Sequence, residues 1–345
     1  MKNKRRWRYL GSFALLATVT VGVITADYLR FLHGPMRVNA DSPRTFVIEP
    51  GTSVQGIANE LAREGLFDRP LYFRLIARAT GAATRIQAGE YAIQPGSTPY
   101  RLLQKIVAGE VKQYRITLIE GWTVAEMLDA IWAHDAIEPT LEGESPDSIM
   151  ERLGHPDLHY EGRFFPDSYQ FPRGTRDIDL LQRSFARMQH VLEEEWQARE
   201  EGLPIDTPAE ALTLASIIER ETGVPEERAR IAGVFVERLE RGMRLQTDPT
   251  VIYGLGDEYQ GDIRYRHLRE DTPYNTYTRA GLPPTPIALS SREAIHAALH
   301  PDRRGDLYFV STGDGRHVFS ETLEQHNQAV IEYQLDGNAD RLRGR

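Results

Sequence analysis

The first hydrophobic feature of the chain is an uncharged run, residues 10–26, rich in Leu, Val, Ala and Thr. Five Lys and Arg side chains at residues 2–8 precede it, and Asp27 closes it. The run is at the short end for a bilayer-spanning helix. A signal peptide has the same basic and apolar parts, but no small-x-small cleavage pattern follows here. We therefore expect an uncleaved anchor, with its basic end in the cytoplasm and the rest exported.

Alternating strand and helix patterns follow a linker that contains glycine and proline. Residues 45–48 predict a strand, residues 52–55 cap a helix, Pro70 opens a second helix, and residues 86–93 predict another strand. This β-α-α-β order resembles the layout of a LysM module, a small fold that binds N-acetyl sugars. A packing or spacer domain is the alternative. Residues 112–119 predict the strand that leads into a larger domain.

The best-bounded helix of that larger domain covers the sequence LTLASIIERETG, residues 212–223. Thr207, Pro208 and Glu210 supply an N-cap hydroxyl, a proline at the first helical position and a capping-box carboxylate. Gly223, with a proline two residues later, predicts a left-handed glycine cap. The helix body is almost entirely apolar, so we expect it to be buried.

Two carboxylates, Glu219 and Glu221, occupy the last turns of this helix. Burial and the negative end of the helix dipole both raise a carboxyl pKa, as a general acid requires. Two solvated glutamates at a helix end are the alternative. At about 100° per residue the side chains point about 160° apart, so they cannot form a facing pair. Periodicity does not choose between them.

Further patterns complete a mixed α+β domain. Helical periodicity covers residues 180–200, 226–241, 290–299 and 322–333, and residues 307–320 predict a β-hairpin. Two polar loops lie between these elements. The first, residues 244–250, contains Gln246 and Asp248 and leads to Tyr253; the second contains Asn275 and Tyr277. The aromatic and acidic segment at residues 161–169 suits either one wall of a sugar groove or a core-edge loop.

Composition narrows the classes of function. The chain has 345 residues, a formal net charge of −9 and no cysteine. This charge argues against a nucleic-acid binder. The absence of cysteine excludes disulfides, thiolate metal sites and a cysteine nucleophile.

Other chemistries have weaker support. His296 and His300 are four residues apart and form a possible metal pair, but the sequence places no third ligand and contains no H-E-x-x-H. Ordinary helix histidines are the simpler interpretation. No dinucleotide fingerprint or G-x-S-x-G occurs, and Ser216 has no base nearby in sequence. We therefore expect no metal and no cofactor. A two-carboxylate glycosidase would need a second carboxylate about 5–9 Å away, from Glu161, Asp167 or Asp248.

The segments LASIIERET, RLQTDPTVIYG, YNTYTRAGLPPTPI, LYFV and HNQAV occur in this order over roughly residues 114–330. Together they closely resemble the MltG (YceG-like) endolytic murein transglycosylases. The anchor and the LysM-like module agree with that architecture, and the family's FPDTY-type segment is FFPDSY here. The resemblance implies that Glu219 is the catalytic acid. Glu221 is then a packing or hydrogen-bonding neighbour.

The resemblance implies lytic cleavage of the MurNAc–GlcNAc β-1,4 bond within nascent glycan strands. Glu219 would protonate the glycosidic oxygen and then accept the proton of the muramoyl C6 hydroxyl, which closes a 1,6-anhydro ring and ends strand elongation. No second carboxylate is needed. The expected substrate-binding residues are Gln246, Asp248, Asn275, Tyr277, Tyr253 and Asp167. Asp248 and Asn275 have loop-capping as an alternative role.

This interpretation places a single-pass protein in the bacterial cytoplasmic membrane, with peptidoglycan as substrate and penicillin-binding synthases as possible neighbours. The rivals are a non-catalytic, membrane-tethered peptidoglycan scaffold and a metal-dependent hydrolase. The expected parts are a cytoplasmic basic end (residues 1–9), an anchor (10–29), a linker (30–43), a LysM-like module (44–112), a catalytic domain (113–335) and a tail (336–345).

Overall fold

The computed structural model describes residues 2–39, 43–335 and 337–338, so most of the expected tail lies outside the described residues. The chain forms two compact units, Met1–Tyr114 with Gln170–Gly174, and Arg115–Tyr169 with Thr175–Arg345. Helices and short strands occur in both, which confirms the mixed α+β class. The return of residues 170–174 to the first unit was not predicted.

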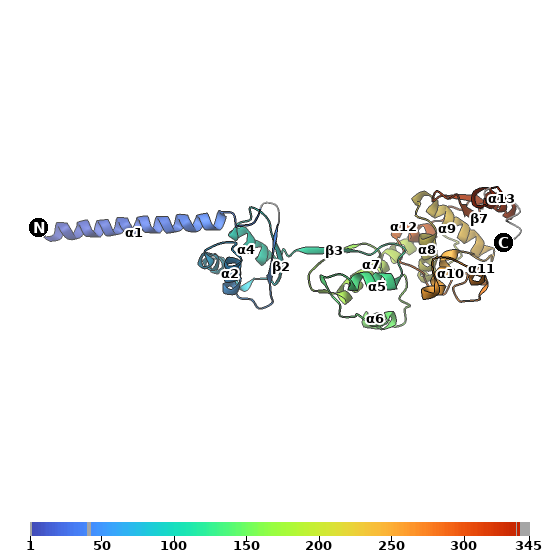
Figure 1. Cartoon of the computed structure of the whole chain (residues 1–345), viewed down its shortest axis with the longest axis horizontal. Helices are drawn as coiled ribbons and strands as arrows, with labels where there is room; N and C mark the ends of the chain where they lie inside the picture. The colour runs from blue at the N-terminus through green and yellow to red at the C-terminus, as the bar shows by residue number, and fades with distance from the viewer. Residues whose placement is uncertain (1, 40–42, 336, 339–345) are drawn as a thin grey trace. The chain divides into compact units, whose positions relative to one another are not determined.

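The N-terminal apolar run belongs to α1, Lys2–His33, which is one uninterrupted helix in Figure 1. Its segment Gly11–His33 is long and apolar enough to cross a membrane, and an apolar stretch of 18 residues within it has no buried residue. The helix continues four residues into the expected linker. Its last turns are held by aromatic packing, because Tyr28 and Phe31 contact the Tyr72 ring edge-to-face with centroids 5.3 and 5.6 Å apart.

The first unit has the predicted β-α-α-β order. β1, Arg44–Ile48, pairs antiparallel with β2, Gly89–Ile93, and α2 (Val54–Arg63), α3 (Pro70–Ala79) and the 3-10 turn Ala82–Thr84 lie between them in sequence. α4, Pro99–Ala108, completes the unit. Its core contains Phe46, Phe73, Tyr91 and Leu102. The likeness of this unit to a LysM module and its binding of sugar stay predictions.

The second unit is mainly helical, with short strands at its edges. Its helices are α5 (Val124–Trp132), α6 (Pro146–Arg152), α7 (Asp177–Ala198), α8 (Pro208–Glu221), α9 (Pro225–Glu240), α10 (Asp248–Leu255), α11 (Tyr265–Arg269), α12 (Arg292–Leu299) and α13 (Leu323–Gln334), with a 3-10 turn at Gly256–Glu258. Two-stranded sheets join β4 (Ile137–Glu138) to β6 (Thr175–Arg176) and β7 (Tyr308–Ser311) to β8 (His317–Ser320). A further sheet joins β3 (Gln113–Thr117) to β5 (Ser168–Pro172), and each of these two strands has residues in both units.

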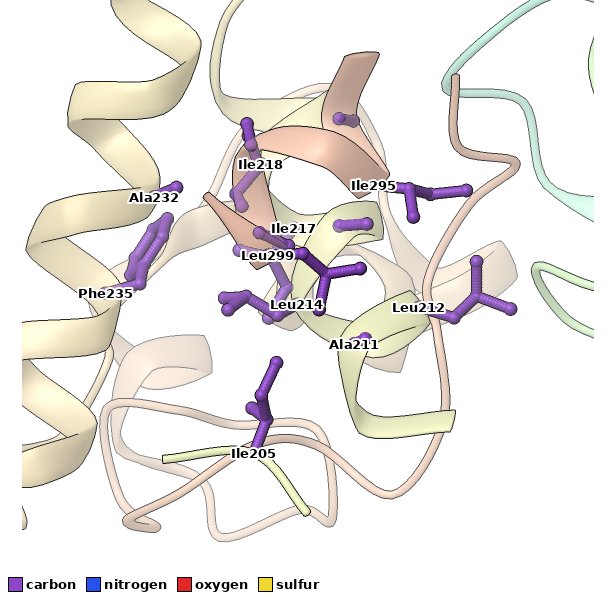
Figure 2. Close-up of a cluster of buried hydrophobic side chains, with 14 of the residues drawn as sticks. Ile205, Ala211, Leu212, Leu214, Ile217, Ile218, Ala232, Phe235, Ile295 and Leu299 are labelled. Carbon is purple, nitrogen blue, oxygen red and sulfur yellow. The ribbon is translucent and has the colours of Figure 1, made fainter. Parts of the chain in front are cut away.

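The helix α8 lies at the centre of the main core. Its capping box is complete, with both reciprocal bonds between Thr207 and Glu210 present. Every residue from 211 to 218 is buried, as predicted. Figure 2 shows side chains of α8 gathered with Phe235 of α9 and Ile295 and Leu299 of α12. Packing on several sides fixes the end of α8, where the two glutamates lie.

Two local predictions were wrong. Gly223 is not the left-handed cap, because α8 ends at Thr222 in an extended conformation and no positive φ occurs at Gly223. The Thr222 hydroxyl accepts a hydrogen bond from the Val224 N–H at 3.0 Å, which makes a glycine cap unnecessary. The polar loop is also shorter than expected. Asp248 is already the first residue of α10, because the following proline is tolerated in a first helical turn.

Candidate active site

The two glutamates of α8 face different partners. Glu219 turns towards α12, where its Oε2 accepts hydrogen bonds from the Ser291 N–H at 2.8 Å and from the Ser291 hydroxyl. Its Oε1 lies 3.6 Å from a guanidinium nitrogen of Arg228 on α9, and only 7% of its side chain is exposed. Ser291 is also the N-cap of α12. The Glu219 carboxylate therefore joins three helices.

Glu221 turns towards the segment before α10. The Thr247 hydroxyl donates a hydrogen bond to its Oε1. Burial raises the pKa of Glu221 to about 7, and the negative charge of Asp248 adds to the rise, while the Thr247 hydrogen bond and the Arg238 charge oppose it. As whole residues, Glu219 and Glu221 are both half-buried. With a pKa of about 7, the Glu221 carboxyl is protonated in a large fraction of molecules near neutral pH.

Arg238 of α9 holds this segment in shape. Its side chain is buried and donates to the carbonyl oxygens of Leu307 at 2.7 Å, Leu245 at 2.8 Å and Arg244 at 3.1 Å. Gln246, which follows, has a φ of +52°, and among the described residues other than glycine it alone has a positive φ. Such a conformation is costly for a side chain with a Cβ and persists where surrounding contacts enforce it. The Gln246 side chain remains exposed.

The second polar loop packs directly against the first. The Gln246 N–H donates to the Thr276 carbonyl at 3.2 Å, and the Thr247 N–H donates to the Thr276 hydroxyl at 3.1 Å. The Tyr277 hydroxyl donates to Asp248 Oδ1 at 2.6 Å. Burial and the neighbouring Asp248 raise the pKa of Tyr277, so this hydroxyl stays a donor. Gln246, Asp248 and Tyr277 thus lie together beside Glu221.

Asn275 has a different position from these three. Its side-chain nitrogen donates to the carbonyl oxygens of His267 at 3.0 Å and Glu270 at 2.7 Å, and its Oδ1 accepts from the Tyr277 N–H at 2.9 Å. The residue is 1% exposed. This geometry fits the alternative role, stabilisation of the loop.

Half-buried Tyr253 and buried Glu161 form a separate pair. The Tyr253 hydroxyl donates to Glu161 Oε2 at 3.1 Å, and the Val124 N–H at the start of α5 donates to Oε1 at 3.0 Å. Glu161 is 2% exposed. Burial raises its pKa to about 7, although both hydrogen bonds act in the opposite direction. The pair ties α10 to α5.

A pH-dependent stability follows from Glu161. The folded state binds its proton up to about pH 7 and the unfolded state only to about pH 4.5, so stability falls as pH rises between these values. At 1.36 kcal/mol per pKa unit, the loss is about 3 kcal/mol. Urea unfolding at pH 5 and pH 8 should show a smaller difference for Glu161→Gln than for the unchanged chain. Glu193→Gln, at an exposed position of α7, is the control and should retain the full difference; equal differences in all three would contradict this assignment.

The remaining candidates lie elsewhere. Asp167 is exposed, and its carboxylate accepts from the neighbouring Ser168 N–H at 2.7 Å. Within the described residues no hydrogen bond or ion pair links it to either glutamate of α8. Ser216 is buried, donates to the Thr213 carbonyl at 2.7 Å and accepts from the Ile287 N–H at 3.0 Å. These bonds give Ser216 a structural role.

A family model described as the YceG-like family matches residues 46–332. The chain belongs to this family. The predicted resemblance is therefore confirmed.

Individual members of the family show the same similarity. An endolytic murein transglycosylase of Bacillus subtilis is 29% identical over an aligned length of 325 residues, and the match covers 88% of this chain and 89% of that protein. One from Streptococcus pneumoniae strain D39 is 26% identical over an aligned length of 333 residues, and the match covers 87% of this chain and 60% of that longer protein. The crystal structure of a yceG-like protein from Listeria monocytogenes matches with a TM-score of 0.53 and 27% identity, over 83% of this chain and 98% of that one.

Three residues of the site in this YceG-like chain were not predicted. Thr247 donates to Glu221, Thr276 joins the two loops, and Arg238 shapes the first loop. The sequence carries a signal only for Thr247, which stands beside Asp248 in the polar segment. Arg238 reads as one charged position on an amphipathic helix, and its burial depends on contacts with segments distant in sequence.

Proposed function

We propose that this chain is a membrane-anchored peptidoglycan lytic transglycosylase whose general acid is Glu221. The observation that carries the proposal is a carboxyl with a pKa of about 7 that accepts a hydrogen bond from Thr247, beside two polar loops. A general acid is most effective when its pKa lies near the working pH. Relatives named endolytic murein transglycosylase support the substrate and the reaction class.

The proposed reaction needs one carboxyl group. Protonated Glu221 gives its proton to the oxygen of the MurNAc–GlcNAc β-1,4 bond as the C1–O bond breaks. The muramoyl C6 oxygen then bonds to C1 and closes the 1,6-anhydro ring, and its proton goes to the Glu221 carboxylate. The acid is regenerated and no water is consumed. The step does not use the neighbouring Asp248 carboxylate, which accepts a hydrogen bond from Tyr277.

The loops supply groups that can position the sugar. The exposed amide of Gln246 and the Asp248–Tyr277 pair lie next to the acid. Holding the C6 hydroxyl against C1 so that it outcompetes water is a positioning effect, and such effects are large when reacting atoms are fixed together. We assign this role to Gln246, Asp248 and Tyr277. Asp248 also helps to keep Glu221 protonated through its negative charge.

Glu219, which the resemblance implied as the acid, receives a different proposed role. Its carboxylate is committed to Ser291 and Arg228, and it holds the C-terminal end of α8 against α12 and α9. That contact fixes the helix turn from which Glu221 projects. The earlier assignment of Glu219 stays a rival prediction that paired variants separate.

The apolar helix α1 fits a single-pass anchor that keeps the enzyme near nascent glycan strands. Cytoplasmic placement of the basic end follows from the positive-inside rule. Cutting at this position would end strand elongation close to the membrane. Association with penicillin-binding synthases remains a prediction.

End-group analysis tests the proposed reaction. The full chain in detergent micelles, incubated with purified glycan strands, should release fragments that end in 1,6-anhydroMurNAc and resist borohydride reduction. Reducible ends alone would contradict lytic cleavage. Binding to strands without any product would favour the non-catalytic scaffold. Reducible ends whose formation stops on chelation would favour a metal-dependent hydrolase.

The activity should also report the pKa of the acid. Because Glu221 must be protonated to act, kcat/KM should fall about tenfold per pH unit above about pH 7. Neutralising Asp248 removes a charge that raises the Glu221 pKa, so Asp248→Asn should move this alkaline limb to lower pH. The pH–rate profiles of the two proteins measure the shift. An unmoved or upward-shifted limb would contradict the proposed electrostatic role of Asp248.

A further inference from the structure

The fold supplies the third ligand that the sequence did not place beside His296 and His300. Glu195, near the end of α7, contributes a carboxylate, and one ligand atom from each of the three residues lies within 4.8 Å of the others. The two imidazole rings are stacked, with centroids 4.1 Å apart and planes 18° apart. Two histidines and a carboxylate form a common ligand set for zinc.

We propose that Glu195, His296 and His300 bind one divalent transition-metal ion of the zinc class. Tetrahedral bonds of about 2.0–2.2 Å place neighbouring ligand atoms about 3.3 Å apart. His296 Nδ1 lies 2.8 Å from Glu195 Oε2, so an ion replaces the shared proton when this pair opens by about 0.5 Å. His300 must approach through side-chain rotation. A water molecule is then the fourth ligand of the tetrahedral ion.

The surroundings favour a metal over an isolated hydrogen-bonded cluster. Arg292 donates to Glu195 Oε1 at 2.8 Å and leaves Oε2 facing His296, so the carboxylate is oriented by an outer partner as metal ligands usually are. The side chain of Glu195 is 9% exposed, whereas that of His296 is 57% exposed. An ion can therefore enter from solvent and meet a buried carboxylate.

The site would fasten two helices of the main core. Glu195 belongs to α7, and His296 lies in α12 while His300 is its C-cap. Without the ion, His300 Nε2 lies 2.9 Å from the Ala198 carbonyl and its Nδ1 lies 3.2 Å from the His296 carbonyl, so the rotation towards the ion exchanges these contacts for a metal bond. At the N-terminal end of α12, the N–H of the N-cap residue Ser291 donates a hydrogen bond to Glu219. The bound ion thus stabilises the helix against which the proposed catalytic helix packs, without contacting substrate.

Titration of the full chain, purified without a histidine tag in detergent, with Zn²⁺ alone tests the proposal. Calorimetry should show one ion per chain, and a hundredfold excess over Kd should raise the melting temperature by roughly 5 °C or more. His296→Ala and His300→Ala should each weaken binding at least tenfold. Co²⁺ should give the intense visible absorption of a four-coordinate ion, and the variants should lose it.

His190 of α7, the helix that carries Glu195, offers a matched control. His190 Nε2 is 3.1 Å from Glu194 Oε1 at the surface of α7, outside the three-residue cluster. His190→Ala should leave the affinity and the stoichiometry unchanged. Absence of saturable binding in the unchanged chain, or equal affinity in the His296 and His300 variants, would overturn the metal site. The melting temperatures of the metal-free variants separate lost ligands from lost folding.

Discussion

Glu221→Gln should lower kcat by about 10²- to 10⁴-fold, the range that a positioned general acid contributes. The substitution keeps the shape of the side chain and its acceptance of the Thr247 hydrogen bond, but removes the titrating proton. Binding of glycan strands and the melting temperature should therefore change little. Turnover of defined strands, followed by chromatography of the fragments, gives kcat directly.

Glu219→Gln is the matched control, two residues away on the same helix. It removes a charge beside Arg228 and weakens an anchored contact, so we expect a loss of about 1–2 kcal/mol in stability. Its kcat should stay within tenfold of the unchanged enzyme. A folded but inactive Glu219→Gln beside an active Glu221→Gln would restore the assignment implied by the sequence resemblance and refute ours.

Arg238→Met should produce the second largest effect, a loss of about 3 kcal/mol in stability together with a large loss of activity. The substitution preserves apolar volume but leaves the carbonyl oxygens of Leu307 and Leu245 without their charged donor. Gln246 would then lose the support for its positive φ. Urea unfolding and turnover at saturating substrate measure the two losses.

The Arg238 charge has a separate electrostatic consequence. It lowers the pKa of Glu221, so its removal should move the alkaline limb of the pH–rate profile upward in Arg238→Met. Arg238→Lys keeps the charge but lacks the planar fork, so it should lose stability while leaving the limb nearly in place. If both variants move the limb equally, loop distortion and not charge controls the Glu221 pKa.

Much of the fold was accessible from local patterns. The capping box at Thr207, the proline that starts α3 and the alternation that forms the β7–β8 hairpin are all set by neighbouring residues. The end of α8 was harder to predict, because the hydroxyl of Thr222, and not a left-handed glycine, caps the helix. The packed end of α1 was also missed, because an apolar run looks the same whether lipid or protein covers it.

The choice between the two glutamates depends on long-range contacts. Both lie beside the apolar stripe of α8 at similar angles, so periodicity treats them alike. Their hydrogen-bond partners distinguish them. Ser291 lies 72 residues from Glu219 in sequence, and Thr247 lies 26 residues from Glu221. The same holds for Glu195, which is a residue of a charged helix face in sequence and a buried partner of His296 in the fold.

Isotope incorporation tests the central claim most directly. Glycan strands are digested by the full chain in H₂¹⁸O, and the new fragment ends are analysed by mass spectrometry. Lytic cleavage by Glu221 forms the 1,6-anhydro end from the substrate's own C6 oxygen, so we predict ends that lack ¹⁸O and are one water lighter than hydrolysed ends. New ends that carry ¹⁸O at C1 as the main product would show attack by water and contradict the account.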